Sequence, residues 1–142
     1  MQFNPYLNFD GDCAEAFAFY KDLFKGTIVH QSTFGEMPDA SQMPPEASGR
    51  IMHVHLQIGA QALMGSDTLP GACSGEAGGY SKPQGLWVSI GVADADEGRR
   101  VFDALAAGGQ VSMPFEKTFW SPGFGMVTDR FKTPWMVNVA SA

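Results

Sequence analysis

Two histidines separated by one residue are the clearest candidates for chemistry in this sequence. His53 and His55 lie in the run Met52-His-Val-His-Leu56, and Gln57 follows them. Because side chains alternate along a β-strand, we expect both imidazoles and Gln57 on one face. Two such imidazoles can hold a metal ion, bind a carboxylate or hydroxyl, or transfer protons near neutral pH. No Asp, Glu or Cys lies on the same strand, so we favour a solvated or hydrogen-bonded sheet face over a metal site.

A second group of candidates is aromatic and lies in the C-terminal half of the chain. Large amphipathic rings of this kind often line pockets for small molecules. The aromatic candidates are Trp87, Phe119, Trp120, Phe124 and Trp135. Gly123 and Gly125 predict a tight turn or bulge that re-aims the neighbouring rings. We expect Trp135 to be core, and for Trp120 the pocket and the core both stay open.

The other reactive side chains are interpreted as structural. Cys13 lies near the start of the first expected helix without a His, Asn or second Cys nearby, so it is predicted to pack as a small apolar group, reduced like Cys73. We expect His30 at the surface or in packing, and Asp129 in a turn. The sequence carries no nucleophile elbow and no glycine motif for phosphates or dinucleotides.

The composition is typical of a globular chain without nucleic-acid or membrane partners. Its 142 residues are 44% hydrophobic, which is enough to bury a core, and the formal net charge is −6. Lysine and arginine are scattered, so the basic patch that nucleic acid requires is missing. No apolar run reaches the roughly 18 residues of a membrane helix, and no signal peptide is seen. We therefore expect a cytoplasmic protein.

The elements that must position these residues occur twice in the same order, strand, helix and three strands. In the first half, strands are expected over 3–9, 27–34, 51–58 and 61–66, with a helix capped by Asp12 and stopped by Gly26. In the second half, strands are expected over 85–92, 110–120, 123–129 and 134–140, with a helix that follows Asp94. Asp94 lies 82 positions after Asp12, and the apolar residues of the two helices overlay at the same shift.

This repeat predicts one domain over 1–142, made of a module 1–66, a linker loop 67–84 and a module 85–142. The linker is rich in glycine, and a second long loop, 35–49, contains three prolines. Loops of this length are either functional covers or spacers.

The paired βαβββ pattern is accompanied by Pro5-Tyr-Leu-Asn-Phe9, Phe19-Tyr20 and the stretch from Thr118-Phe-Trp to Pro134-Trp-Met-Val-Asn138. Together these features resemble the PhnB-like branch of the vicinal oxygen chelate superfamily. That superfamily includes glyoxalase I, bleomycin-resistance proteins and extradiol dioxygenases. The resemblance implies an α+β fold with curved mixed sheets forming a cleft, and a homodimer. It also implies a divalent ion in the metalloenzymes of the family.

The metal positions implied by the resemblance are not filled by good ligands in this chain. They fall on Asn4 or Pro5 in the first module, and on Trp87 and Met136 in the second, and a thioether is a poor partner for hard or borderline ions. We therefore expect no cofactor. A divalent metal stays the alternative, and it would use His53 and His55.

Two classes of function follow from this interpretation. The first and favoured class is a protein that binds a small molecule in an aromatic-lined cleft, to which His53, His55, Gln57, Trp87, Phe119, Trp120 and Phe124 would contribute. The alternative is a metal-dependent lyase, isomerase or dioxygenase. Names in the family suggest phosphonate metabolism or ubiquinone methylation, but the sequence shows neither concentrated positive charge nor a methyl-donor site.

Overall fold

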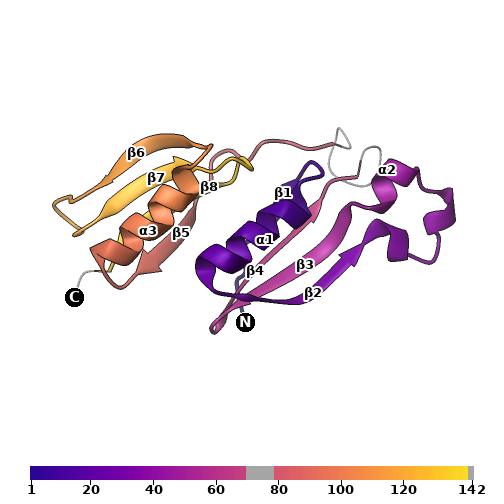
Figure 1. Ribbon diagram of the computed structural model, residues 1–142, viewed down its shortest axis with the longest axis horizontal. Coiled ribbons are helices and arrows are strands. Elements are labelled where there is room, and N and C mark those ends of the chain that lie inside the picture. The colour runs from indigo at the N-terminus through magenta and orange to yellow at the C-terminus, as the bar shows by residue number, and fades with distance from the viewer. Residues whose placement is uncertain (70–78, 141–142) are drawn as a thin grey trace. The chain divides into compact units, whose positions relative to one another are not determined.

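The computed structural model describes residues 1–69 and 79–140, and Figure 1 shows two four-stranded mixed sheets, each with its own helix. The chain divides into two compact units, Met1–Ser81 (the first unit) and Lys82–Ala142 (the second unit). Each unit follows the order strand, helix and three strands, which confirms the predicted α+β fold of two βαβββ modules. Cys73 and the middle of the predicted linker lie outside the described residues.

The first sheet has the strand order β1-β4-β3-β2, and only the pair of β1 and β4 is parallel. The elements of this unit are β1 (Tyr6–Phe9), α1 (Cys13–Phe24), β2 (Thr27–Thr33), β3 (Ile51–Ile58) and β4 (Gln61–Asp67). β1 begins at Tyr6 rather than at residue 3, because Pro5 has no N–H to extend the ladder. The tight turn at Gly59 lies where the sequence predicted it.

The second sheet repeats this topology in the order β5-β8-β7-β6, with β5 parallel to β8. Its elements are β5 (Val88–Val92), α3 (Ala95–Ala106), β6 (Gln110–Glu116), β7 (Phe124–Thr128) and β8 (Pro134–Val139). β5 begins three residues later than predicted, after Gly85, which adopts a φ of 72° that is foreign to a strand.

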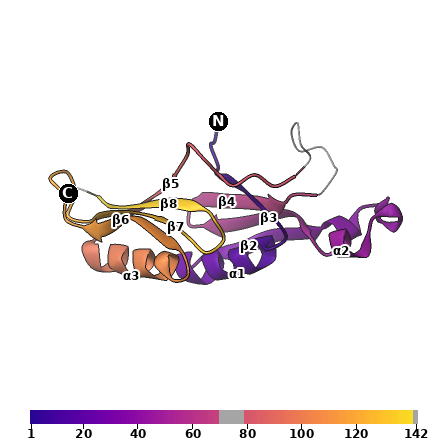
Figure 2. The ribbon, with the colours of Figure 1, turned by 90° about the horizontal axis from the view of Figure 1, so that it is seen from above.

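One face of each sheet is covered by the helix of its own unit (Figure 2). Under α1 lie Phe9, Val54 and Leu56, and under α3 lie Val127 and Val137, all of them buried. No helix within residues 1–69 and 79–140 has the length and apolar character needed to cross a membrane.

The first helix begins after Asp12 and ends before Gly26, as predicted, but its ends are held by other interactions than expected. Asp12 makes no side-chain capping hydrogen bond; instead Asp67 Oδ1 accepts hydrogen bonds from the backbone N–H of Gly11 (2.8 Å) and of Cys13 (3.1 Å). At the other end Lys25, not Gly26, adopts the left-handed conformation, with a φ of 55°. Gly26 is required for a different reason, since a Cβ there would lie 2.8 Å from the carbonyl oxygen of Gln57.

The long loop of the first unit contains short helical segments rather than an irregular spacer. They are η1 (Phe34–Glu36), η2 (Ala40–Gln42) and α2 (Pro45–Ser48). α2 begins with proline at its first position, where the missing N–H costs no hydrogen bond.

Candidate functional site

The predicted histidine pair lies on the face of the first sheet that α1 leaves uncovered. Val54 and Leu56 point toward the helix and are fully buried, so His53, His55 and Gln57, which alternate with them, point the other way. We call this side the polar face. The pairing of the four strands places on it Tyr6, Asn8, His30, Ser32, His53, His55, Gln57 and Ser66, together with the apolar Met64 and Ala62.

His53 lies at the centre of a cluster on the polar face. The Tyr6 hydroxyl is 3.1 Å from His53 Nδ1, and the two rings are stacked with their centroids 5.7 Å apart. The ring of His30 approaches from the other side, with a centroid distance of 5.8 Å. His55 is held separately, with its Nε2 3.1 Å from Oε1 of Gln57.

The cluster favours the neutral form of the central imidazole. Burial lowers the pKa of His53 below its ordinary value, and the positive charges that His30 and His55 acquire on protonation lower it further. A neutral imidazole has one donor and one acceptor nitrogen, so His53 can hydrogen-bond to Tyr6 and still offer a nitrogen to a hydroxyl or carbonyl group.

An unused polar atom lies beside this cluster. Ser32 pairs with His53 across the strands β2 and β3, and it is only 9% exposed. Its Oγ is buried and finds no hydrogen-bond partner among the described residues. A buried hydroxyl without a partner is costly, and both the donor and the acceptor of Ser32 are unused there.

The sequence did not identify two members of the cluster. His30 was predicted to lie at the surface or in packing, and it is exposed, but its contact with the ring of His53 was not predicted. Tyr6 was not singled out. The pairing of β2 with β3 contains an irregularity between Ile28 and His30, and only this shift brings His30 opposite His55.

The described residues do not fit the divalent ion that the family resemblance implies. No group of three or more His, Cys, Asp or Glu side chains is placed to hold a metal within residues 1–69 and 79–140. Met136 lies on β8 between Ser89 and Met126, so its neighbours offer a hydroxyl and a second thioether rather than carboxylates or imidazoles.

The aromatic candidates belong to the second unit. Trp87 precedes β5 and is 37% exposed. Phe119 and Trp120 lie between β6 and β7 and are 97% and 46% exposed, with edge-to-face contacts from Phe119 to Trp120 and from Trp120 to Phe124. Trp120 is therefore not a core residue.

Two structural interpretations of this region are confirmed. Trp135 is core at 1% exposed, and its Nε1–H donates to Asp129 Oδ2 at 2.8 Å. Asp129 organises a turn by accepting backbone hydrogen bonds from Phe131 and Thr133.

The two glycines near Phe124 were predicted to permit a tight turn or bulge. Neither Gly123 nor Gly125 has a positive φ, but the pairing of β6 with β7 is irregular between Met113 and Glu116, opposite Gly125. Both glycines also make room for rings, since a Cβ on Gly123 would lie 2.4 Å from Phe115 and one on Gly125 would lie 2.6 Å from Phe102.

Cys13 is structural, as predicted. It is fully buried, and burial raises the pKa of its thiol, with the charges of Asp67 and Asp12 adding to the effect. A thiol held protonated in this way is a poor nucleophile.

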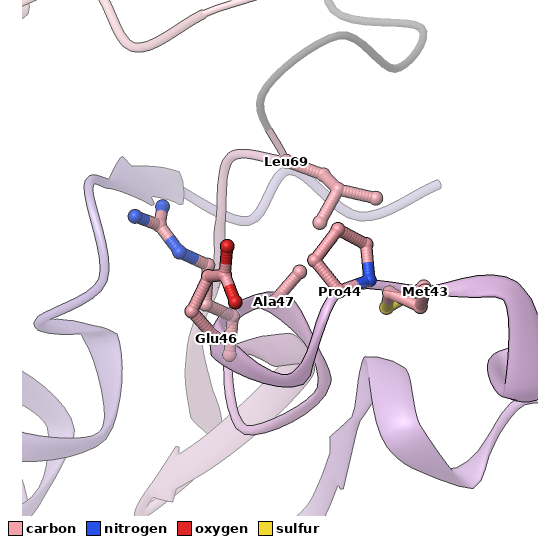
Figure 3. Close-up of a pocket in the computed structure, with 6 residues that line it drawn as sticks. Met43, Pro44, Glu46, Ala47 and Leu69 are labelled. Carbon is pink, nitrogen blue, oxygen red and sulfur yellow. The ribbon is translucent and has the colours of Figure 1, made fainter.

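A small cavity lies beside α2, between the long loop and the end of the first sheet. Its volume is about 170 Å³, below the roughly 300–1,000 Å³ of sites for drug-sized ligands. Figure 3 shows Leu69 facing Pro44 across it, with Glu46 and Ala47 on one side. Arg50 also lines it, but its guanidinium already donates to Asp10 Oδ1 and to the Thr68 carbonyl. We therefore interpret the cavity as a packing gap between loops rather than as a ligand site.

The two βαβββ units and their uncovered sheet faces define a protein of the vicinal oxygen chelate class, and comparison with known proteins agrees with this. A family model described as 3-demethylubiquinone-9 3-methyltransferase matches residues 1–138. Protein YjdN of Escherichia coli K12 is 39% identical over 98% of this chain and 95% of its own length.

Solved structures give the same result. The crystal structure of protein PA1353 from Pseudomonas aeruginosa is 40% identical with a TM-score of 0.87, covering 100% of this chain and 99% of that one. The PhnB protein from Bacillus cereus is 23% identical with a TM-score of 0.76, covering 99% and 100%. The chain belongs to this family, the PhnB-like branch of the vicinal oxygen chelate superfamily.

Proposed function

We propose that this protein binds a small molecule through the polar face of its first unit, without the metal site usual in the superfamily. The proposal is supported by the contact of Tyr6 and His30 with His53, beside Ser32 Oγ, which has no partner within residues 1–69 and 79–140. A hydroxyl, an imidazole and a serine within one patch suit a ligand with hydroxyl or carbonyl groups, because each can donate or accept one hydrogen bond.

The aromatic residues of the second unit support a small-molecule ligand. Trp87, Phe119 and Trp120 expose large rings to solvent, which is unusual for residues that serve only the core. We further propose that the working form is a homodimer in the cytoplasm, built from one domain over 1–142 with a module 1–66, a linker 67–84 and a module 85–142.

The test is native mass spectrometry of protein purified without chelator, which reports the number of subunits and any co-purified species together. We expect a dimer that carries an organic mass. His53→Ala and Tyr6→Phe should lose that mass, whereas Gln31→Ala, an exposed change on the same sheet, should keep it.

Retention of the mass by both His53→Ala and Tyr6→Phe would contradict the proposed site. A dimer with one stoichiometric divalent ion, lost in His53→Ala and His55→Ala, would instead favour the alternative of a metal-dependent lyase, isomerase or dioxygenase.

A further inference from the structure

The uncovered face of the second sheet differs in chemistry from the polar face. Strand pairing places Met113, Met126 and Met136 side by side in one row across β6, β7 and β8. The next row contains Phe124, Asn138 and Gly91, from β7, β8 and β5. We call this surface, with Trp120, the methionine–aromatic face.

The centre of the second row has an unsatisfied hydrogen-bond acceptor. Oδ1 of Asn138 is buried and has no partner among the described residues. Asn138 as a whole is only half-buried, so a rotation of its amide can turn this oxygen outward. A buried carbonyl oxygen that lacks a donor is rare, and a donor from a ligand would satisfy it.

Space for such a ligand lies directly beside Asn138. Gly91 is its neighbour on β5, and a Cβ built on Gly91 would have no heavy atom within 4 Å. On the other side of Asn138 lies Phe124, and the ring of Trp120 packs edge-to-face against it at a centroid distance of 5.3 Å. We call these two rings the aromatic wall. A flat ring placed over Gly91 would find both a wall and a hydrogen-bond acceptor.

The rest of the face selects against anions. The three methionines offer polarizable, adaptable contacts without charge. Glu116, which pairs with Phe124 at the edge of the sheet, is the charged residue of this row and is exposed. A neutral or cationic ligand is therefore favoured over an anionic one.

We propose that the methionine–aromatic face binds a planar aromatic ligand whose N–H or O–H group donates a hydrogen bond to Asn138 Oδ1. This inference rests on the proposed function only in that the ligand is a small molecule. It assigns a chemical class to the ligand of this face, namely a neutral or cationic aromatic compound with a donor on or next to its ring.

Indole and benzofuran are suitable probes, because they have nearly the same shape and only indole carries a ring N–H donor. Their affinities are measured by ligand-observed NMR for the full chain. We expect indole to bind about fivefold more tightly, which is what one hydrogen bond contributes. Asn138→Leu should abolish the preference, and Gly91→Val should weaken both probes about tenfold by filling the space over Asn138. Gln31→Leu, an amide-to-leucine change on the other sheet, should alter neither.

Thermal unfolding separates a binding role from a structural one. Asn138→Leu removes an unsatisfied acceptor, so it should not lower the melting temperature while it removes the indole preference. Equal affinity for both probes, no binding of either, or a preference that survives in Asn138→Leu would overturn the inference. Dissociation of a dimer by Gly91→Val would overturn it too, because a second copy of the chain would then cover this face. The proposed function is judged separately, by whether His53→Ala loses the co-purified mass.

Discussion

His53 lies between Tyr6 and His30, and this position controls its protonation. Because burial and the neighbouring histidines lower its pKa below the ordinary value of 6.5, folding favours the neutral ring. The unfolded chain then binds more protons than the folded one as the pH falls below about 6.5, so the contribution of His53 to stability is present above that pH and is lost below it.

We expect an NMR titration of the folded protein to give His53 a midpoint below 6.5. His30→Ala should move this midpoint upward, because one repelling charge is removed. A midpoint at or above the ordinary value, or one that His30→Ala leaves unchanged, would contradict this account of the cluster.

Asp67 joins three parts of the first unit through one buried carboxylate. Oδ1 accepts from Gly11 and Cys13 at the start of α1, and Oδ2 accepts from the Ile51 N–H at the start of β3 at 2.8 Å. Asp67→Asn places an amide NH₂ against at least one of these donors. We expect a loss of about 2–3 kcal/mol in the free energy of unfolding, measured by urea denaturation.

Asp22→Asn is the matched control for this change, since Asp22 is exposed on α1 and the same charge is removed. It should change the unfolding free energy by less than about 0.5 kcal/mol. Equal effects of the two substitutions would mean that net charge, rather than the hydrogen bonds of Asp67, determines the result.

At the scale of the elements, strand glycines distinguish the packed face of the second sheet from its uncovered face. Gly125 points toward α3, where a Cβ would lie 2.6 Å from Phe102, whereas a Cβ on Gly91 would meet open space. We expect Gly125→Ala to lower stability by about 1–3 kcal/mol through overpacking. Gly91→Ala should be neutral or slightly stabilising, because alanine loses less backbone entropy on folding. Thermal and urea unfolding measure the stability of both variants. An unchanged free energy of unfolding in Gly125→Ala would contradict the prediction and show that α3 can shift to make room for the methyl group.

The order of the elements could be predicted from the sequence, because it depends on local alternation and helical spacing. β3 and β4 were predicted to within one residue, around the turn at Gly59. The helix cap was missed because its acceptor, Asp67, lies on a strand far away in sequence. The roles of Gly26 and Gly125 were missed for the same reason, since the atoms they make room for belong to other elements.

The candidate site, like the fold, could be predicted only where it depends on local sequence patterns. Alternation alone places His53 and His55 on one face, as the structure confirms. It does not bring His30 and Tyr6 to His53, because that requires the strand order and the irregular pairing of β2. Ser32 Oγ and Asn138 Oδ1, which lack partners in the described part of the chain, have no sequence signal, because burial and hydrogen bonding depend on the complete fold.

At the scale of the whole molecule, two copies of one topology carry different chemistry. The strand orders β1-β4-β3-β2 and β5-β8-β7-β6 correspond element by element. The uncovered face of the first sheet nevertheless holds histidine, tyrosine and serine, and that of the second holds methionine and aromatic side chains. A repeat that served stability alone would need only its helix-covered faces, so the different side chains on the two uncovered faces suit each face to a separate role.

Metal dependence is the property that most sharply separates the two classes of function. Because the implied positions offer Trp87 and Met136 instead of imidazole and carboxylate, we expect EDTA to change the melting temperature by less than about 1 °C. Adding Mn²⁺ or Zn²⁺ to chelator-treated protein should not raise it. A rise that disappears in both His53→Ala and His55→Ala would establish a metal at the polar face and make an enzyme the better description. A rise that all variants share would be non-specific binding, which leaves the polar face as a site for hydrogen bonding alone.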